Sequence, residues 1–260
     1  MELNGVPVTV DQIGALGLVG YGHFTSMRVE GGGVRGLQLH LDRLIRDCRT
    51  VFEADLDSGL VRDLVRQILC GKDETVIVRV TVFDPNLELG KPGADAQPHV
   101  LVTKRRAPVT PLGPLSLQSA VYSRDLPRVK HVGLFGALHQ RRNAQRNGFD
   151  DVLFTTADGT VTEIATSNIG FISADGQLIW PQADVLPGTT MRLISQTRDE
   201  EVLSQAITLA QLPQFAAAVA TNAAVGLRPV SRIDDTQWPV EHELIDILRK
   251  EYESIPPQPI

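Results

Sequence analysis

A proline-rich stretch before the middle of the chain constrains the fold more than any other feature. Arg105 to Pro114 contains three prolines and one glycine without a hydrophobic period, which is typical of an exposed linker. Strand-like and helix-like patterns occur on both sides of it. The simplest expectation is an α/β (α+β) fold with two domains, residues 1–104 and residues 115–260, joined by a linker at residues 105–114.

The first of these two segments is predicted to hold strands and two helices. Runs rich in β-branched residues predict strands at Thr75–Phe83 and His99–Thr103. A hairpin is predicted around Gly31-Gly32-Gly33, with strands at Phe24–Glu30 and Val34–Leu39. Helical spacing of apolar residues predicts helices at His40–Phe52 and Gly59–Cys70, the second with Ser58 as N-cap and Gly71 as C-cap.

The second segment begins with a predicted strand and alternates strands with helices. Strands are expected at Leu115–Tyr122, within residues 151–180, at Phe215–Ala220 and at Leu227–Ile233. Helices are expected at Gly133–Asn147, Thr189–Arg198 and Pro239–Tyr252. This pattern predicts a larger C-terminal domain that holds a sheet with helices around it.

Composition excludes several classes of partner. The 260 residues carry a formal charge of −6 without a basic stripe, so we expect no nucleic-acid partner. No apolar run approaches the roughly 20 residues that cross a bilayer, and the N-terminus does not resemble a signal peptide. The only cysteines, Cys48 and Cys70, lack metal or disulfide spacing. We therefore expect no metal and a reducing, cytoplasmic location.

The lysines are the most informative candidates for chemistry, because no HExxH, GxSxG, Walker A or GxGxxG motif opens a predicted helix after a strand. Of the five lysines, only Lys130 precedes a run of small and apolar residues, Val132 to Leu138. A desolvated lysine there could act as an amine nucleophile toward a carbonyl. The alternative is a strand-end lysine whose ammonium group reaches water.

Five short pieces, in order, resemble the core of the class IV aminotransferases, the fold type IV enzymes that use pyridoxal 5′-phosphate (PLP), and two more extend the resemblance on either side of it. This group includes branched-chain aminotransferases, D-amino-acid aminotransferases and 4-amino-4-deoxychorismate lyase. The pieces are Lys130-His131, Asn147 to Leu153, Asp158 to Glu163, Ser167-Asn168-Ile169, Leu186 to Thr190, and, outside this core, His40 to Leu44 with Thr221-Asn222-Ala223. The resemblance covers most of the chain and implies a smaller N-terminal α/β domain and a larger C-terminal domain with a barrel-like sheet.

The resemblance also implies roles for individual residues. Lys130 would form the Schiff base with the PLP aldehyde and move the proton at the substrate α-carbon. Glu163 would face the pyridine nitrogen and keep it protonated. The phosphate would be bound by Gly188, Thr189 and Thr190 at a helix N-terminus, by Arg43, and by Thr221 and Asn222.

A substrate carboxylate needs an arginine fork or several N–H and hydroxyl donors. Arg79 and Arg28 are the candidates, on strands expected to border the pocket, and Thr25 could add a hydroxyl. Arg79 occupies the strand position where branched-chain enzymes have an arginine. The alternatives are that strand alternation turns Arg79 to solvent and that Arg28 pairs with an acidic neighbour.

Two activities stay open at this point. Phe135 stands where branched-chain enzymes have a tyrosine, and Phe24-Thr25-Ser26 is nearer to the lyases. Val161-Thr162-Glu163 with Ser167-Asn168 is nearer to the aminotransferases, although Ile164 replaces their usual glycine. The sequence therefore predicts an aminotransferase acting on an amino acid and a 2-oxo acid, or a lyase that releases pyruvate from aminodeoxychorismate. The resemblance implies a homodimer in either case, with PLP at the domain interface.

Overall fold

A computed structural model describes residues 1–69 and 74–260. Cys70, the predicted cap Gly71 and Lys72 lie outside the described residues. The chain forms two compact units. The first unit comprises Met1–Pro108, Val129–Gly133 and Pro256–Ile260, and the second comprises Val109–Arg128 and Leu134–Ile255. The short segment Val129–Gly133, which contains Lys130, therefore packs with the first unit although both of its neighbours along the chain belong to the second.

The first unit is built on a seven-stranded sheet with the order β16-β4-β3-β5-β6-β1-β2. Its three long strands, β3 (His23–Glu30), β5 (Val76–Phe83) and β6 (His99–Arg106), pair antiparallel in the centre. Its short strands are β1 (Glu2–Leu3), β2 (Val6–Pro7), β4 (Gly33–Val34) and β16 (Gln258–Pro259). Over much of its length β3 has only β5 beside it, because β4 pairs only with Val29 and Glu30.

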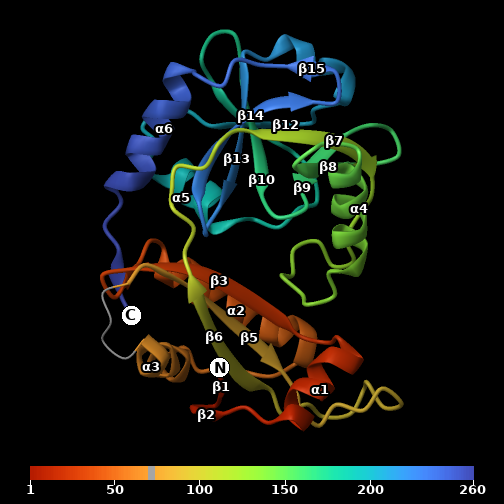
Figure 1. The fold of residues 1–260 in the computed structure, drawn as a ribbon, viewed down its shortest axis with the longest axis vertical. Coiled ribbons are helices and arrows are strands. Elements are labelled where there is room, and N and C mark those ends of the chain that lie inside the picture. Colours follow the sequence, from red (N-terminus) through yellow and green to blue (C-terminus); the bar gives the residue numbers. More distant parts are fainter. Residues whose placement is uncertain (70–73) are drawn as a thin grey trace. The chain divides into compact units, whose positions relative to one another are not determined.

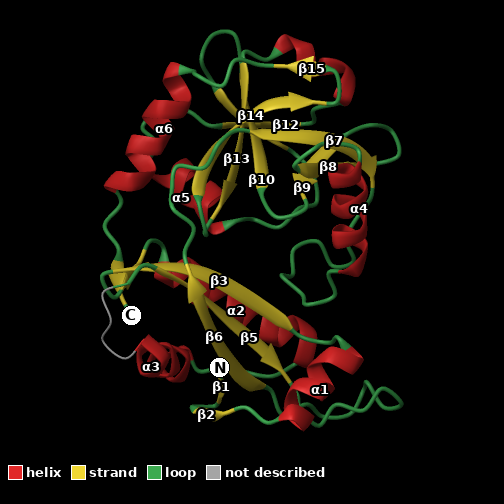
Figure 2. Ribbon diagram, in the orientation of Figure 1, coloured by secondary structure: helices red, strands yellow, loops and turns green. Residues whose placement is uncertain are grey.

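Two helices, α2 (Leu37–Phe52) and α3 (Ser58–Leu69), cover one face of this sheet, as Figure 2 shows. Their apolar faces pack on Met27, Val78 and Val102 of the central strands. The other face is covered at one end by α1 (Val10–Val19), whose Ile13 and Leu16 pack near Phe83. The predicted helices are thus present, while α1 was not predicted.

Two local predictions for the first unit were wrong. The strand predicted at Val34–Leu39 ends at Val34, because Gly36 adopts a left-handed conformation and α2 begins at Leu37. Helical spacing then buries Leu37 in the core. Ser58 lies inside α3 rather than capping it, since the carboxylate of Asp57 accepts the N–H of Gly59 at 2.7 Å.

The second unit is built on a nine-stranded, curled sheet (Figure 1). Its main strand order is β12-β11-β10-β13-β14-β7-β8-β9, with β15 paired to β14. The strands are β7 (Leu115–Val121), β8 (Asp151–Thr155), β9 (Val161–Ile164), β10 (Asn168–Ile172), β11 (Leu178–Pro181), β12 (Leu203–Gln205), β13 (Ala217–Asn222), β14 (Gly226–Ile233) and β15 (Thr236–Gln237). The inside of the curl is apolar and holds Leu117, Phe171 and Trp238.

Helices cover the outside of this second sheet. The helices α5 (Thr189–Thr197) and α6 (Glu243–Ser254) pack against β13 and β14, and α4 (Phe135–Arg146) packs against β7 and β8 (Figure 1). The short 3-10 helix η1 (Leu209–Gln214) contributes to the core inside the curl. The last helix begins at Glu243 rather than at the predicted Pro239, because the imidazole of His242 caps it by accepting the N–H of Leu244. Among residues 1–69 and 74–260, no helix is long and apolar enough to cross a membrane.

Candidate active site

Lys130 lies against the free edge of β3 within the first unit. The N–H of Phe24 donates to the carbonyl of Lys130 at 2.8 Å, and the N–H of Val132 donates to the carbonyl of Gly22 at 2.9 Å. An isolated antiparallel bridge joins His23 to His131. The segment that carries Lys130 therefore extends the sheet by a short strand-like pairing, which fixes its backbone.

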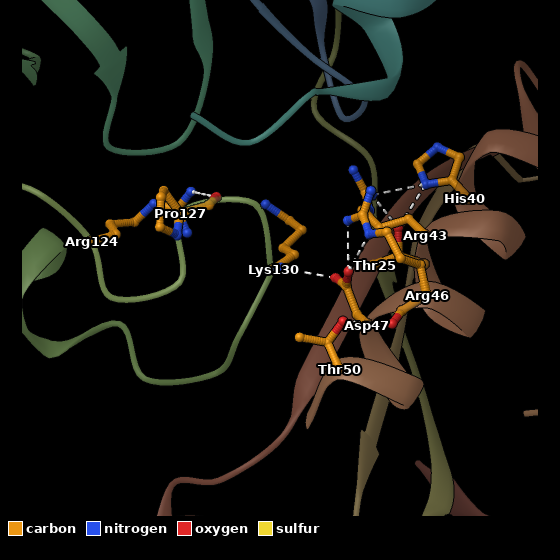
Figure 3. Close-up of polar contacts among 9 residues, drawn as sticks. All are labelled: Thr25, His40, Arg43, Arg46, Asp47, Thr50, Arg124, Pro127 and Lys130. Carbon is orange, nitrogen blue, oxygen red and sulfur yellow. Dashed lines mark hydrogen bonds and ion pairs between the residues drawn. The ribbon is translucent and has the colours of Figure 1, made fainter. Parts of the chain in front are cut away.

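The remaining backbone group of Lys130 is bound by a buried side chain. Asp47, on α2, is fully buried, and its Oδ2 accepts the N–H of Lys130 at 2.9 Å (Figure 3). Its Oδ1 accepts hydrogen bonds from Arg46 at 3.0 and 2.6 Å. Sequence reasoning did not single out Asp47. A signal existed, because Asp47 follows Arg43 by one helical turn and so continues the polar stripe of His40 and Arg43 along α2.

Thr25, His40 and Arg43 form a second buried polar cluster in the first unit. The guanidinium of Arg43 donates to the hydroxyl of Thr25 and to Nδ1 of His40, and Thr25 Oγ1 lies 2.7 Å from the same Nδ1 (Figure 3). Thr25 and His40 are fully buried, and Arg43 is almost so. Because Nδ1 receives an N–H of Arg43, it acts as an acceptor, so the proton of the neutral ring belongs on Nε2.

The environment keeps His40 neutral. Burial lowers the pKa of His40 well below its usual value, and the nearby charges of Arg43 and Lys130 lower it further. A neutral ring can accept from both Arg43 and Thr25, whereas a protonated ring could not. The cluster therefore orients the Arg43 side chain without neutralising its charge.

The opposite face of β3 presents a different set of side chains. The guanidinium carbon of Arg79 stacks 3.6 Å from the centre of the Phe24 ring, and Nζ of Lys130 lies 4.9 Å from the same ring centre. Arg79 is partly buried, and burial lowers its pKa. Its Nε donates a hydrogen bond to the hydroxyl of Thr81 at 3.2 Å. Among the described residues it makes no ion pair, so its positive charge is not compensated by a carboxylate.

Arg28 differs from Arg79 in its partners. It forms an ion pair with Glu30 at 2.6 Å and donates to the carbonyl of Pro108 at 3.1 Å. Because side chains alternate along a strand, Thr25 points to the face opposite that of Arg28. The three predicted substrate residues therefore do not gather in one place: Thr25 lies with Arg43, while Arg79 lies with Phe24 and Lys130.

Glu163 is the central charged group of the second unit. Its Oε1 forms a buried ion pair with Nε of Arg124 at 2.8 Å, and Oε2 accepts the N–H of Leu186 at 3.4 Å. Sequence reasoning missed Arg124, because it lies in the irregular segment between β7 and Lys130 without a motif around it. Ile164, which follows Glu163, has no positive φ, so the loss of the family's usual glycine causes no strain there.

The loop from Leu186 to Gly188 is held close to Glu163. Nδ2 of Asn168 donates to the carbonyl of Leu186 at 2.8 Å. A Cβ on Gly188 would overlap Oδ1 of Asn168, so only glycine fits at this position. Gly188 is the N-cap residue of α5, and no side chain caps that helix end. The unbonded N–H groups of the first turn can therefore bind an anion.

Three buried hydroxyls belong to this same region. Thr221 stands directly opposite Asn168 in the β10–β13 pairing, while Thr189 and Thr190 begin α5. Each of the three hydroxyl oxygens is buried and has no hydrogen-bond partner among the described residues. Asn222 is different, since its amide oxygen accepts the N–H groups of Ala224 and Val225 and its nitrogen donates to Ser167.

Three buried hydroxyls without partners beside an uncapped helix N-terminus form a set of donors suited to an anion. A phosphate offers acceptors for three hydroxyls and for the N–H groups of a helix end. The residues present thus fit the phosphate of PLP in the second unit, and a lysine held beside an aromatic ring fits its aldehyde in the first. Among the described residues no cluster of His, Cys, Asp and Glu could hold a metal ion.

The fold is shared with solved structures named as aminotransferases or as a lyase. A hypothetical aminotransferase from Mycobacterium tuberculosis in its PLP-bound form superposes with a TM-score of 0.81 at 16% identity, covering 96% of this chain and 94% of that one. A branched-chain aminotransferase from Thermoproteus uzoniensis superposes with a TM-score of 0.84 at 19% identity, covering 97% of this chain and 92% of that one. A Legionella pneumophila protein provisionally named a 4-amino-4-deoxychorismate lyase superposes with a TM-score of 0.80 at 22% identity, covering 96% of each chain. The chain therefore has the fold type IV architecture, with its mixed α/β units and curled sheet, as predicted.

Sequence comparison narrows this class to a family. The pattern described as "Amino-transferase class IV" matches residues 22–233, and the chain belongs to that family, whose members are PLP-dependent enzymes. A Rickettsia bellii protein provisionally named a branched-chain-amino-acid aminotransferase is 30% identical over 126 residues, which are 46% of this chain and 43% of that protein. A Rickettsia typhi protein of the same provisional name is 31% identical over 123 residues, which are 45% of this chain and 42% of that protein. The chain thus matches less than half the length of these curated relatives.

Proposed function

We propose that this protein is a PLP-dependent aminotransferase that moves an amino group between an amino acid and a 2-oxo acid through Lys130. One observation carries this proposal: the amine of Lys130 and the guanidinium of Arg79 contact the same ring, that of Phe24. An amino-acid substrate presents an amine or carbonyl carbon close to a carboxylate. An amine nucleophile with an uncompensated guanidinium nearby suits such a molecule.

PLP supplies an electrophilic aldehyde carbon and an electron-withdrawing ring when it is bound. In this proposal Lys130 binds the aldehyde carbon and then moves the proton at the substrate α-carbon. Glu163 binds the pyridine nitrogen, and the ion pair with Arg124 holds its carboxylate in place. The phosphate is bound by Arg43 and by the three partnerless hydroxyls and free N–H groups at the start of α5.

Arg79 is the residue that we propose binds the substrate carboxylate. Its partial burial and stacking on Phe24 hold the guanidinium in one orientation, which favours a bidentate contact. Arg28 is a weaker candidate, because Glu30 and Pro108 already accept its hydrogen bonds. Thr25 and Asn222 are likewise engaged, with Arg43 and with a turn, so in this proposal they support the site rather than contact substrate or phosphate directly.

Removing the Arg79 side chain tests this assignment. Arg79→Ala should raise KM for the amino-acid substrate at least tenfold, as expected when a charge-assisted hydrogen bond worth about 1.5–3 kcal/mol is lost. The visible absorption of bound PLP should not change, because Arg79 does not hold the cofactor. Arg28→Ala is the matched control and should leave KM within about twofold. Equal KM values in the wild type and Arg79→Ala would remove Arg79 from the substrate site.

The alternative activity is release of pyruvate from aminodeoxychorismate to give 4-aminobenzoate. It is favoured by Phe135, which stands at the tyrosine position of the branched-chain enzymes and is 83% exposed. Two assays separate the activities: amino acids with 2-oxoglutarate, followed by oxo-acid formation, and aminodeoxychorismate, followed by pyruvate release. Oxo-acid formation without pyruvate release supports the aminotransferase, and the reverse result replaces it with the lyase.

We further propose that the protein works as a homodimer in a reducing cytoplasm. Large apolar side chains are exposed on α1 and α4, among them Val10, Leu18 and Phe135, and such side chains are suited to burial in an interface. Cys48 is buried and free, as expected in a reducing compartment. Light scattering of the purified protein at several concentrations tests the dimer directly.

A further inference from the structure

Asp47 binds the backbone of the lysine on which the proposed function depends. A fully buried carboxylate in the first unit is committed to a single backbone N–H, that of Lys130, and to its neighbour Arg46. Burying a charge is costly unless it is paired and hydrogen-bonded. A charged acceptor forms a stronger hydrogen bond than a neutral oxygen would. The carboxylate of Asp47 therefore holds the N–H of Lys130 more firmly than a neutral acceptor could.

The geometry explains why the N–H of Lys130 needs this acceptor. In a regular antiparallel pair, Lys130 and Phe24 would exchange both backbone hydrogen bonds, but here the carbonyl of Lys130 accepts from Phe24 of β3 while its N–H donates to a side chain instead. Asp47 reaches this N–H from α2, at 2.9 Å (Figure 3). Both backbone polar groups of Lys130 are then fixed, one by the sheet and one by the helix. The direction of its Cα–Cβ bond follows from these two contacts.

We propose that Asp47 is a positioning residue for Lys130. It holds the lysine backbone so that the side-chain amine stays beside the Phe24 ring. With PLP bound, Lys130 would supply the amine that forms a C=N bond with the aldehyde carbon, with water as the leaving group, so no oxidant or reductant would be needed. This inference rests on the proposed role of Lys130, while Asp47 itself touches neither substrate nor cofactor.

The first measurement is hydrogen exchange at the Lys130 amide in the cofactor-free protein. In the wild type this amide should exchange slowly, whereas in Asp47→Ala it should exchange about tenfold to a hundredfold faster, because a hydrogen bond to a charged acceptor is lost. Asp47→Asn keeps an acceptor oxygen and should restore most of the protection. Asp42→Asn, an exposed substitution on the same helix, is the control and should behave as the wild type. Fast exchange in the wild type would overturn the proposal even if Asp47→Ala does not fold.

The second measurement separates positioning of the lysine from general damage. Borohydride reduction of PLP-treated protein should trap PLP on Lys130 at least tenfold more slowly in Asp47→Ala than in the wild type. Pyridoxine 5′-phosphate, which has no aldehyde, should bind both proteins with the same affinity. Equal trapping rates, or a parallel loss of pyridoxine 5′-phosphate binding, would refute the positioning role. If the wild type itself traps no PLP on Lys130, the proposed function fails instead, and the exchange experiment still reports on the Asp47 contact.

Discussion

The candidate site residues of the two units differ in the contacts that their polar side chains make. In the first unit the candidate residues bind one another: Arg43 contacts Thr25 and His40, and Asp47 holds Lys130. In the second unit the hydroxyls of Thr189, Thr190 and Thr221 have no partner among the described residues. The candidate side chains of the first unit are held by contacts with one another, although Nε2 of His40 is buried without a hydrogen-bond partner, whereas three hydroxyls of the second unit are available to a ligand.

In the proposed function, this difference corresponds to two kinds of side chain that would bind a phosphorylated cofactor. Long, flexible side chains such as lysine and arginine lose much conformational freedom when they are ordered, so they benefit from contacts that hold them beforehand. Short threonine side chains and backbone N–H groups are ordered by the fold itself and need no such support. Three experiments sharpen or break this comparison, beginning with the largest expected effect.

Glu163→Gln tests the charged group of the second unit. The variant should keep PLP bound but lose turnover by about a hundredfold or more, because a neutral amide no longer holds the proton on the pyridine nitrogen. Steady-state rates at saturating PLP measure this effect. Glu200→Gln, at an exposed glutamate that pairs with Arg198, is the control. Full turnover in Glu163→Gln would mean that Glu163 does not act on the cofactor.

His23→Leu tests whether buried neutral histidines characterise the first unit. Burial, assisted by the charge of Arg46, lowers the pKa of His23 from 6.5 to about 3. The unfolded chain therefore takes up a proton below pH 6.5 that the folded protein does not, and stability is lost as pH falls from 6.5 toward 3. The loss is about 1.4 kcal/mol per pH unit. The free energy of unfolding, measured with denaturant between pH 6.5 and 4.5, should fall less steeply with decreasing pH in His23→Leu than in the wild type, by this amount per pH unit. His139→Gln, at an exposed site, should keep the wild-type slope; if His23→Leu keeps it too, the inference is wrong.

A pair of matched threonine substitutions compares the two units directly. Thr25→Val removes a hydroxyl that is bonded to Arg43 and His40 and should lower the unfolding free energy by about 1–3 kcal/mol. Thr190→Val removes a buried hydroxyl without a partner and should cost about 0.5 kcal/mol or less. Its effect should appear instead as weaker PLP binding. Urea unfolding of the cofactor-free variants measures both losses of unfolding free energy. Similar losses in Thr25→Val and Thr190→Val would contradict the difference between the two units.

Much of the fold could be predicted from the sequence because apolar periodicity and turn residues act locally. The long strands β3 and β5 and the helices α2 and α3 were predicted within a few residues. Errors arose where a single residue changes the outcome, as at Gly36, whose left-handed conformation ends β4 and starts α2. The helix α1 was missed because its apolar residues are largely exposed, so they follow no clear buried stripe.

The candidate site was predictable only where motifs mark it. Lys130, Glu163 and the residues around Gly188 lie within such motifs, and their proposed roles stay predictions. Asp47 and Arg124 could not be found in this way, because their importance comes from contacts with residues 83 and 39 positions away in the sequence. The stacking of Arg79 on Phe24 likewise depends on the register of β3 and β5, which no local pattern specifies.

The most direct test of the account is to find where PLP becomes attached. Purified protein is incubated with PLP, reduced with borohydride, digested and examined by mass spectrometry. The account predicts a yellow protein before reduction and a single phosphopyridoxyl group on Lys130 among its five lysines, with no modification at this position and no chromophore in Lys130→Ala. A wild type that stays colourless, or PLP attached to another lysine while position 130 remains unmodified, would contradict the account.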